Sequence, residues 1–535
     1  MNSWLVKYKV FAIPFLALYV WLMVQIAWVG DDAHITFRSM ENFLHGHGPV
    51  FNVGERVQTF THPLWFLVQS GLNTVFNLWK DNPLGQGQMY FLNIFVSVTL
   101  SVLALSILVF RVASSTKGAI LSLVILSLSK AFLDYSTSGL EDPLTNFLLI
   151  LFISTYLSKG ENSQQRVLFL SLLAALGSLN RLDTLLLYLP VLITLPYQNP
   201  EKWKTCITIG IGFLPLVAWE LFSLFYYGAL FPNTAYAKID NGIPILDLIR
   251  QGIFYYQNSF KLDPVTLLVI FMASIAGLAD KNGLDRPIVA GSLLYLLYIL
   301  YIGGDFMSGR FFTGPLLIST VVLARMDFKS LRLYSLSLAL AVVIGIIPIY
   351  LVTERHPSYG ENGANFRVFL DAHRIADERK VYPKLSLRYT LEQKRAPVSE
   401  FARDRWVFTK NAVTKVTLVG QLGLPAYRLG PNVHVIDDNS LADPLMPRLP
   451  LYDVGNWRIG HYHHIIPKGY IETLTTGENM IVDKNIALYY DKLALVVRGD
   501  LWSWARIAEI WNLNTGKYEY LLENIPENAI RYKNP

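Results

Sequence analysis

Long apolar runs separated by short polar links dominate the first 350 or so residues of the chain. The first run begins near Val10 and ends at Val29. A helix needs about twenty apolar residues to cross a bilayer, so these runs predict transmembrane helices, although several are short by that measure. With the first run, the pattern predicts about eleven spans, the others lying near 89–110, 118–135, 142–158, 167–179, 184–197, 205–228, 264–279, 287–302, 311–324 and 333–352.

The pattern changes after residue 352. Short stretches rich in β-branched residues follow, separated by Gly, Pro and Asn-Asp turns. We therefore predict a transmembrane domain over 1–352 and a soluble α/β or β-rich domain over 353–535, opened by a helix within 371–386. Its expected strands are "KVTLVG" (415–420), "VHVID" (433–437), "NMIVD" (479–483) and "LALVV" (493–497).

Composition supports a polytopic α-helical membrane protein. Hydrophobic residues make up 52% of the chain and charged residues 16%, which excludes an ordinary soluble protein. The formal net charge is +6. The sequence contains no basic tract with interleaved aromatic residues, which argues against nucleic acid as a partner. The single cysteine, Cys206, excludes an intramolecular disulfide.

Charge placement predicts the orientation of the spans. Lys7 and Lys9 precede the first run, and basic residues recur in alternate links, as expected of cytoplasmic loops. This holds if the stretch 61–79, which is long enough to cross but interrupted by polar residues, lies at the interface instead. The N-terminus is then cytoplasmic, whereas the other links and the C-terminal domain are extracytoplasmic.

An acidic pair follows the first span on the predicted outer face. Asp31 and Asp32 are adjacent, so their carboxylates repel one another, and at an interface one of them needs a cation, a proton or a basic partner. On a helix Asp31, His34 and Arg38 share one face, and Asp32 points about 100° away. One acid is therefore free for chemistry while its neighbour orients it or binds substrate.

Three cations lie in other links of the same face. Arg181 in "NRLD", Lys238 in "PNTAYAK" and Arg310 in "GGDFMSGR" would lie where a lipid phosphate lies, and arginine binds phosphate through paired donors. Glycines 139, 303 and 304 would let the backbone approach a bulky ligand, unless they merely end helices. The alternative for each cation is an ion pair with a nearby acid: Asp183, Asp240 or Asp305.

Several motifs in chain order, from about residue 25 to about residue 475, resemble a known family. The chain is similar to the terminal arabinofuranosyltransferases of mycobacterial and corynebacterial cell walls, which are GT-C enzymes. The motifs are "GDDAHITFRSMENFLHGHGPVFNVGERVQTFTHPLW", "SGLEDPL", "YYGALFPNTAYAK", "GGDFMSGRFF", "YRLGPNVHVIDDNSLADPLMPRLP" and "RIGHYHHIIPKGY".

The resemblance implies roles for matching residues. Asp31 would be the base that activates the acceptor hydroxyl, and Asp32 its partner. Glu141 and Asp305 would hold sugar hydroxyls. The further candidates are Arg38, Lys238 and Arg310 for the leaving phosphate, His62, Arg181 and Asn233 for substrate, and Asp437 and Asp443 for acceptor binding or, equally, for loop structure as turn-capping residues.

The resemblance also implies an activity. It predicts a bacterial inner-membrane glycosyltransferase that moves a sugar, D-arabinofuranose foremost, from a polyprenyl-phosphate donor to a cell-surface glycan. The alternatives are glycosylation of a pilin or another surface protein, and a transporter or flippase of lipid-linked sugars. A divalent cation (Mg or Ca) is a conceivable cofactor. No metal site is predicted at "HYHH", because His461, His463 and His464 cannot readily face one ion from a strand.

Overall fold

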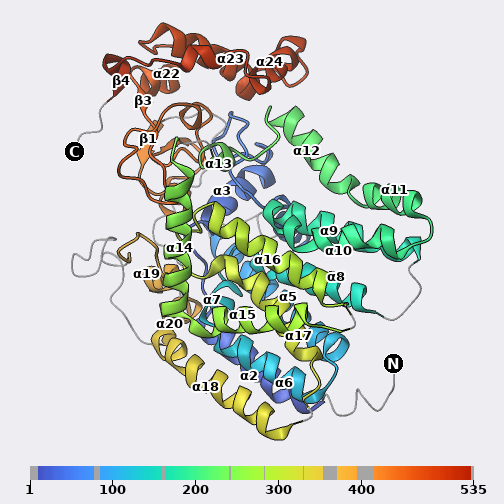
Figure 1. Ribbon diagram of the computed structural model, residues 1–535. Helices are drawn as coiled ribbons and strands as arrows, with labels where there is room; N and C mark the ends of the chain where they lie inside the picture. Colours follow the sequence, from blue (N-terminus) through green and yellow to red (C-terminus); the bar gives the residue numbers. More distant parts are fainter. Residues whose placement is uncertain are drawn as a thin grey trace. The chain divides into compact units, whose positions relative to one another are not determined.

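The computed structural model is mostly helical and describes residues 10–76, 85–158, 163–239, 242–281, 283–328, 330–353, 370–393 and 415–531 (Figure 1). The chain divides into two compact units, each built from three separate stretches. Unit 1 comprises 1–30, 90–216 and 244–397, and unit 2 comprises 31–89, 217–243 and 398–535. Lys7, Lys9 and Asp240 lie outside the described residues.

Unit 1 is an array of helices. Its helices are α2 (Ile13–Ile26), α5 (Gly85–Ile107, of which the first residues belong to unit 2), α6 (Thr116–Leu128), α7 (Lys130–Tyr135), α8 (Asp142–Leu157), α9 (Gln164–Asn180), α10 (Leu185–Gln198), α11 (Lys202–Gly212), α14 (Ile245–Leu262), α15 (Pro264–Leu278), α16 (Arg286–Tyr301), α17 (Thr313–Arg325), α18 (Leu331–Thr353), α19 (Glu378–Val381) and α20 (Leu387–Gln393).

Local sequence explains how these helices start and pack. Before α15, the Asp263 carboxylate accepts a hydrogen bond from the backbone of Thr266, and Pro264 occupies the first helical position, where it costs no hydrogen bond. A Cβ on Gly291 of α16 would lie 2.4 Å from the Leu187 carbonyl oxygen of α10. A small residue at this position therefore allows the two helices to pack closely.

Membrane-spanning helices are fewer in the structure than in the prediction. Among the described residues, only Gly87–Val112 forms a single helix both long and apolar enough to cross a bilayer. Two bent pairs, α11 with α12 (Leu214–Tyr226) and α14 with α15, would raise the number to three. The count of about eleven stays a prediction. The ambiguous stretch 61–79 contains α4 (Pro63–Val75), whose 13 residues are too few to span, and residues 77–79 lie outside the described part.

Residues just beyond the predicted domain boundary belong to unit 1. Lys130 of α7 is buried and forms ion pairs with Asp134 and, at 2.8 Å, with Asp377. Apart from the four residues of α19 and a single 3-10 turn, the stretch 371–386 is irregular, so the predicted opening helix is largely absent. The folding of 353–535 as a separate domain stays a prediction.

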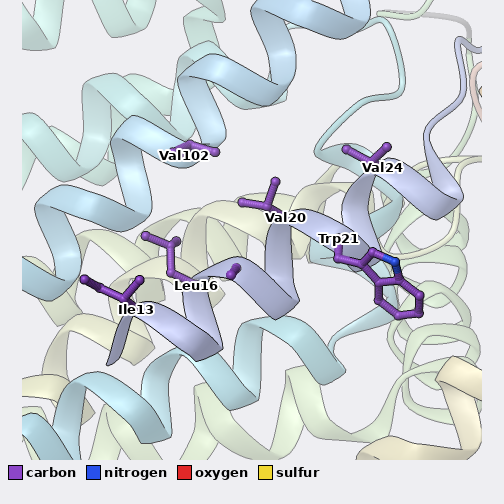
Figure 2. A pocket seen from close by; sticks show the side chains of 7 residues that line it. Ile13, Leu16, Val20, Trp21, Val24 and Val102 are labelled. Carbon is purple, nitrogen blue, oxygen red and sulfur yellow. The ribbon is translucent and has the colours of Figure 1, made fainter. Parts of the chain in front are cut away.

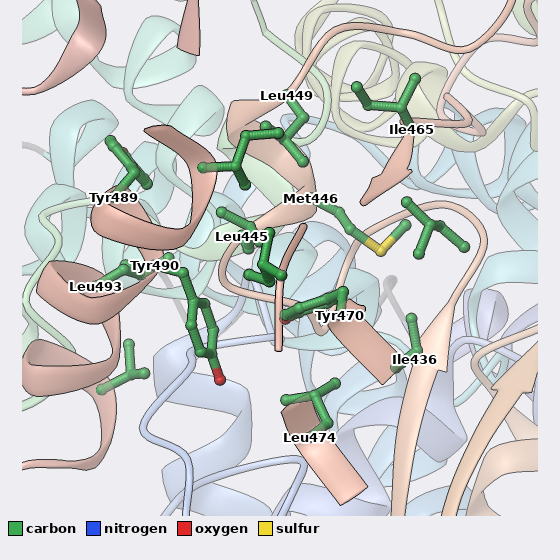
Figure 3. Close-up of a cluster of buried hydrophobic side chains, with 14 of the residues drawn as sticks. Ile436, Leu445, Met446, Leu449, Ile465, Tyr470, Leu474, Tyr489, Tyr490 and Leu493 are labelled. Carbon is green, nitrogen blue, oxygen red and sulfur yellow. The ribbon is translucent and has the colours of Figure 1, made fainter. Parts of the chain in front are cut away.

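Unit 2 combines short helices with two small sheets. Its elements are α3 (Ala33–Leu44), α4, most of α12, α13 (Asn233–Tyr236), α21 (Leu424–Leu429), α22 (Tyr470–Thr476), α23 (Lys484–Arg498), α24 (Trp504–Asn514), β1 (Lys415–Val419), β2 (Val433–Asp437), β3 (Ile466–Pro467) and β4 (Ile530–Arg531). β1 and β2 are parallel, with Lys415 opposite Val433, whereas β3 and β4 are antiparallel. Figure 3 shows the larger hydrophobic core, where Leu445, Met446 and Tyr470 meet Tyr490 and Leu493 of α23.

The structure confirms two of the four expected strands. β1 and β2 match the predictions at 415–420 and 433–437. The strand predicted at 493–497 is wrong, because these residues lie inside α23. The buried positions of that helix, Ile486, Tyr489, Tyr490, Leu493, Val496 and Val497, follow a helical period rather than alternation. Residues 479–483 form no strand either.

Candidate functional site

Asp31 lies at the start of α3 and is bound by a segment almost four hundred residues later in the chain. Its carboxylate Oδ1 accepts a hydrogen bond of 2.8 Å from the backbone N–H of Leu424, the first residue of α21. Gly423 lies still closer, because a Cβ there would be 2.3 Å from both the carbonyl oxygen and Oδ2 of Asp31. All three residues belong to unit 2.

The surroundings of Asp31 raise the pKa of its carboxyl. Burial, and then the charge of Asp32, raise its pKa to about 7, while the backbone of Leu424 and Gly423 and the charge of Arg428 oppose that rise. A carboxyl with this pKa is about half ionised at neutral pH and still accepts protons strongly, which suits general-base chemistry.

The predicted shared face of Asp31, His34 and Arg38 is confirmed, and it faces α21. The His34 ring lies 5.7 Å from that of Tyr427, and Arg38 Nη1 donates to the Ala426 carbonyl at 2.6 Å. Ile35 of α3 and Ala426 share a small hydrophobic core. α3 and α21 are therefore joined along this face.

Arg38 differs from the prediction. It is fully buried, and besides Ala426 its guanidinium donates to the carbonyls of Phe51 and Val433, both at 2.8 Å. Three backbone partners use its donors, which favours a structural role over the predicted contact with phosphate.

Two further candidates also have structural contacts. His62 Nε2 shares a 2.7 Å hydrogen bond with Thr36 Oγ1. The Asn233 side chain donates to three backbone carbonyls, those of Ser440, Leu441 and Asp443, at 2.8–3.1 Å. Asn233 therefore fixes the conformation of the 440–443 loop.

Asp437 and Asp443 shape the same loop. The Asp437 carboxylate accepts hydrogen bonds from the backbone of Leu441 and Ala442, and burial above all raises its pKa to about 7. Asp443 accepts from two backbone N–H groups and from Tyr470 Oη at 2.8 Å, and burial raises its pKa to about 6. Of the two predicted roles, this geometry favours loop structure over acceptor binding.

Lys238 is exposed just after α13. Burial, followed by the charges of Arg458 and Lys238, holds the pKa of His461 well below its usual range, so this imidazole is neutral. Among the described residues, no three His, Cys, Asp or Glu side chains are grouped so that they could hold one metal ion.

Unit 1 brings together three other predicted residues in a second polar cluster, the Glu141 cluster. Glu141 Oε1 accepts hydrogen bonds from Arg310 Nη2 at 2.7 Å and from Arg181 Nη1 at 3.2 Å. Glu141 precedes α8, Arg181 follows α9, and Arg310 precedes α17, so three helix ends meet at one carboxylate oxygen.

Further acids complete the Glu141 cluster. Arg181 forms an ion pair with Asp183 at 2.8 Å, as the alternative interpretation of Arg181 predicted. Arg310 lies 3.5 Å from Asp142 and farther, 3.9 Å, from Asp305. Asp305 is buried, and its Oδ2 has no hydrogen bond within the described part of the chain. Four carboxylates thus surround two guanidinium groups.

Gly304, beside the Glu141 cluster, serves packing. Gly304 has a φ of +74°, and a Cβ there would lie 2.4 Å from the Tyr255 ring. The predicted close approach is therefore to a protein side chain rather than to a ligand.

A groove along α2 is purely apolar. Figure 2 shows its lining residues, among them Ile13, Leu16, Val20 and Trp21, with Val102 of α5 opposite. The seven described residues that line this groove are apolar or aromatic, and none of them carries an acid, a base or a phosphate-binding cation.

No feature of the sequence pointed to Gly423 and Leu424 as partners of Asp31. "GQLGLPAYRL" indicates only a turn followed by a short helix, with Pro425 in its first turn. Covariation between the two segments across related sequences would reveal their contact, but a single sequence contains no such information.

Comparisons with known proteins point to glycosyltransferases. No family model matches the chain. Over 345 residues it is 30% identical to the terminal β-(1→2)-arabinofuranosyltransferase of Mycobacterium tuberculosis, covering 56% of this chain and 52% of that protein. The enzyme of the same name from Corynebacterium glutamicum is 27% identical over 332 residues, covering 54% of this chain and 46% of that protein. The resemblance predicted from the motifs is confirmed, and the chain spans about half the length of these curated relatives.

Two solved structures align distantly with this chain. An oligosaccharyltransferase of Archaeoglobus fulgidus, crystallised with zinc and sulfate, aligns with a TM-score of 0.44 and 11% identity over 79% of this chain and 62% of that one. ArnT of Cupriavidus metallidurans, bound to undecaprenyl phosphate, aligns with the same TM-score and identity over 81% of this chain and 86% of that one.

Proposed function

We propose that this chain is a membrane glycosyltransferase that moves a sugar, D-arabinofuranose foremost, from a polyprenyl-phosphate donor to a cell-surface glycan on the extracytoplasmic face. The observation that carries the proposal is the 30% identity over 345 residues to a terminal arabinofuranosyltransferase. The donor, the acceptor and the membrane orientation are parts of the proposal.

Asp31 is the proposed general base. Its carboxylate would take the proton from the incoming sugar hydroxyl as the new glycosidic bond forms. A pKa of about 7 supports this role, because the ionised form is available near neutral pH. Asp32 raises the proton affinity of Asp31 through its charge, which fits the predicted partner role.

The Glu141 cluster contains the groups proposed to bind the donor. Arg310 Nε makes no hydrogen bond within the described residues and is the donor best suited to a phosphate, whose departure concentrates negative charge, whereas every nitrogen of Arg181 already donates to Glu141 or Asp183. Asp305 Oδ2 lies 3.9 Å from Arg310 Nη1 but makes no hydrogen bond within the described residues, so it would accept one from a sugar hydroxyl. A divalent cation would supply further charge stabilisation if one binds, and no step of the proposal depends on it.

Substitution of Asp31 tests the proposal. Purified protein in nanodiscs is incubated with a synthetic polyprenyl-phosphoarabinofuranose and a short arabinan acceptor. Asp31→Asn should lower kcat by about a hundredfold or more, because general-base catalysis contributes that much. The amide oxygen of the variant still accepts the Leu424 N–H, so folding should be preserved. Asp453→Asn, which removes an exposed acid of the same unit, is the matched control.

Two outcomes would count against the proposal in different ways. An undiminished rate in Asp31→Asn would remove the proposed base. Transfer from another lipid-linked sugar, but none from the arabinofuranose donor, would leave glycosyl transfer intact and overturn the proposed donor.

A further inference from the structure

Three tryptophans near the end of unit 2 are unusually exposed. Trp502, Trp504 and Trp511 are 74%, 83% and 72% exposed. On α24, the exposed positions are 504, 505, 508, 511 and 514, which hold Trp, Ala, Ala, Trp and Asn. The exposed face of a helix in contact with water is normally rich in charge, so this uncharged face indicates a different environment.

The charged side chains of α24 are used within the unit. Arg506 is fully buried and donates to the carbonyls of Val496 and Leu501. Glu509 accepts a hydrogen bond from Tyr518 and pairs with Lys492 at 3.2 Å. The exposed face of α24 can therefore be buried in lipid without burying an unpaired charge.

α24 is fastened to the C-terminal end of α12. Arg506 Nη2 donates to the carbonyl of Tyr226, the last residue of α12, at 2.8 Å, and Asn514 donates to the carbonyl of Gly228 at 2.8 Å. The ring of Trp502 lies 4.9 Å from that of Phe225. Figure 1 shows α24 beside this end of α12, and all of these residues belong to unit 2.

α12 is itself suited to lipid. Together with α11 it is long and apolar enough for a broken span or a re-entrant loop, with a bend of 45° between the two helices. The large side chains that α12 exposes are apolar: Leu214, Val217, Leu221 and Phe222. Leu230 and Phe231, just after the helix, are also exposed. The apolar exposure thus runs from α12 to the point where α24 is attached.

We propose that Trp502, Trp504 and Trp511 form an interfacial anchor that holds α24 in the headgroup region of the bilayer entered by α12. Tryptophan is enriched at this depth because its ring is apolar and its N–H remains hydrogen-bonded. A helix with one uncharged aromatic face lies in the interface plane rather than crossing it. The inference concerns membrane placement and does not depend on the sugar transferred.

Spin labels on the full-length protein in nanodiscs test the anchor. Cys206 is replaced by Ser, and a single cysteine is introduced at 504 or 511. Lys484→Cys is the control. Lys484 is exposed at the N-terminal end of α23, and the 15 residues of that helix place it about 22 Å from the C-terminal end of α23, which precedes the tryptophans. The ratio of collisions with oxygen to collisions with a water-soluble nickel chelate should be at least about fivefold higher at 504 and 511 than at 484.

The other occupants of this face give different results. Equal nickel access at 504, 511 and 484 would overturn the anchor. Spin–spin coupling between labels on two copies would assign the face to a dimer. Protection by soluble arabinan, in place of lipid, would assign it to a glycan.

Intrinsic fluorescence gives an independent measurement without cysteine variants. Brominated lipids should quench wild-type tryptophan emission more than that of a variant with all three tryptophans replaced by phenylalanine. The chain has 12 tryptophans, so the quenchable part should fall measurably. An unchanged quenchable fraction in a folded variant would refute the proposal.

Discussion

Replacing Gly423 with alanine should disturb Asp31 without touching the aspartate itself. The added Cβ would lie 2.3 Å from Asp31 Oδ2 and 2.4 Å from its Cγ, where real contacts are at least a full ångström longer. One of the two segments must therefore move by about 1 Å. Such a movement would stretch the 2.8 Å hydrogen bond from Leu424 N–H to Oδ1 beyond the usual limit.

The loss should appear in the pKa of Asp31. A hydrogen bond to a charged group contributes about 1.5–3 kcal/mol, and it stabilises the ionised carboxylate over the protonated one. Since one pH unit corresponds to about 1.4 kcal/mol, its loss should raise the pKa by about one to two pH units above the present value. At pH 7 the ionised fraction, and with it the rate, should fall by roughly five- to fiftyfold.

The dependence of kcat on pH measures this shift. The wild-type rate should rise as pH increases through about 7, because the base must lose its proton. In Gly423→Ala the same rise should occur at higher pH, with the plateau rate largely restored. Gly420→Ala is the matched control in the same loop, since its nearest neighbour, Asp438 Oδ2, would be 3.9 Å away. A folded Gly423→Ala protein whose profile coincides with that of Gly420→Ala would refute the reasoning.

Two further substitutions separate structural from functional contacts. Arg38→Lys should lower the free energy of unfolding by on the order of 3 kcal/mol or more, because a single nitrogen cannot reach three carbonyls that are bound by three different guanidinium nitrogens. Unchanged thermal stability with weaker donor binding would instead favour the phosphate role. Glu141→Gln should destabilise the protein by about 1–3 kcal/mol, because Arg181 and Arg310 lose a shared charged acceptor while Asp183 and Asp142 remain beside them. Glu392→Gln, which breaks an exposed pair with Arg388, should change stability by less than about 1 kcal/mol in the same melting experiment.

The sequence predicted local features of the fold better than long-range ones. β1 and β2 were predictable because β-branched residues fill short stretches bounded by turns. The run at 493–497 misled because five apolar residues in a row fit a buried strand as well as a helix. Only the spacing of Ile486, Tyr489 and Tyr490 before it reveals the helix. The number of spans stays a prediction, since several apolar runs form described helices of only 10–17 residues, and length alone does not decide whether they cross.

The candidate site was predictable where chemistry is local. The adjacency of Asp31 and Asp32 is visible in the sequence, and so is the helical face that includes His34. The partner of that face is not visible, and Arg38 therefore appeared to be free for phosphate. In the folded chain it binds Phe51, Ala426 and Val433.

The contacts of α3 and of the preceding Asp31 link the C-terminal residues to the candidate site. Asp31 depends on Leu424 for a hydrogen bond, and Ile35 is covered by Leu422, Ala426 and neighbouring residues. Without these later residues the first polar helix would expose apolar surface and lose the donors that favour the ionised base. The C-terminal stretch therefore contributes to the proposed chemistry itself, because the backbone of Gly423 and Leu424, almost four hundred residues after Asp31, favours the ionised form of the proposed base.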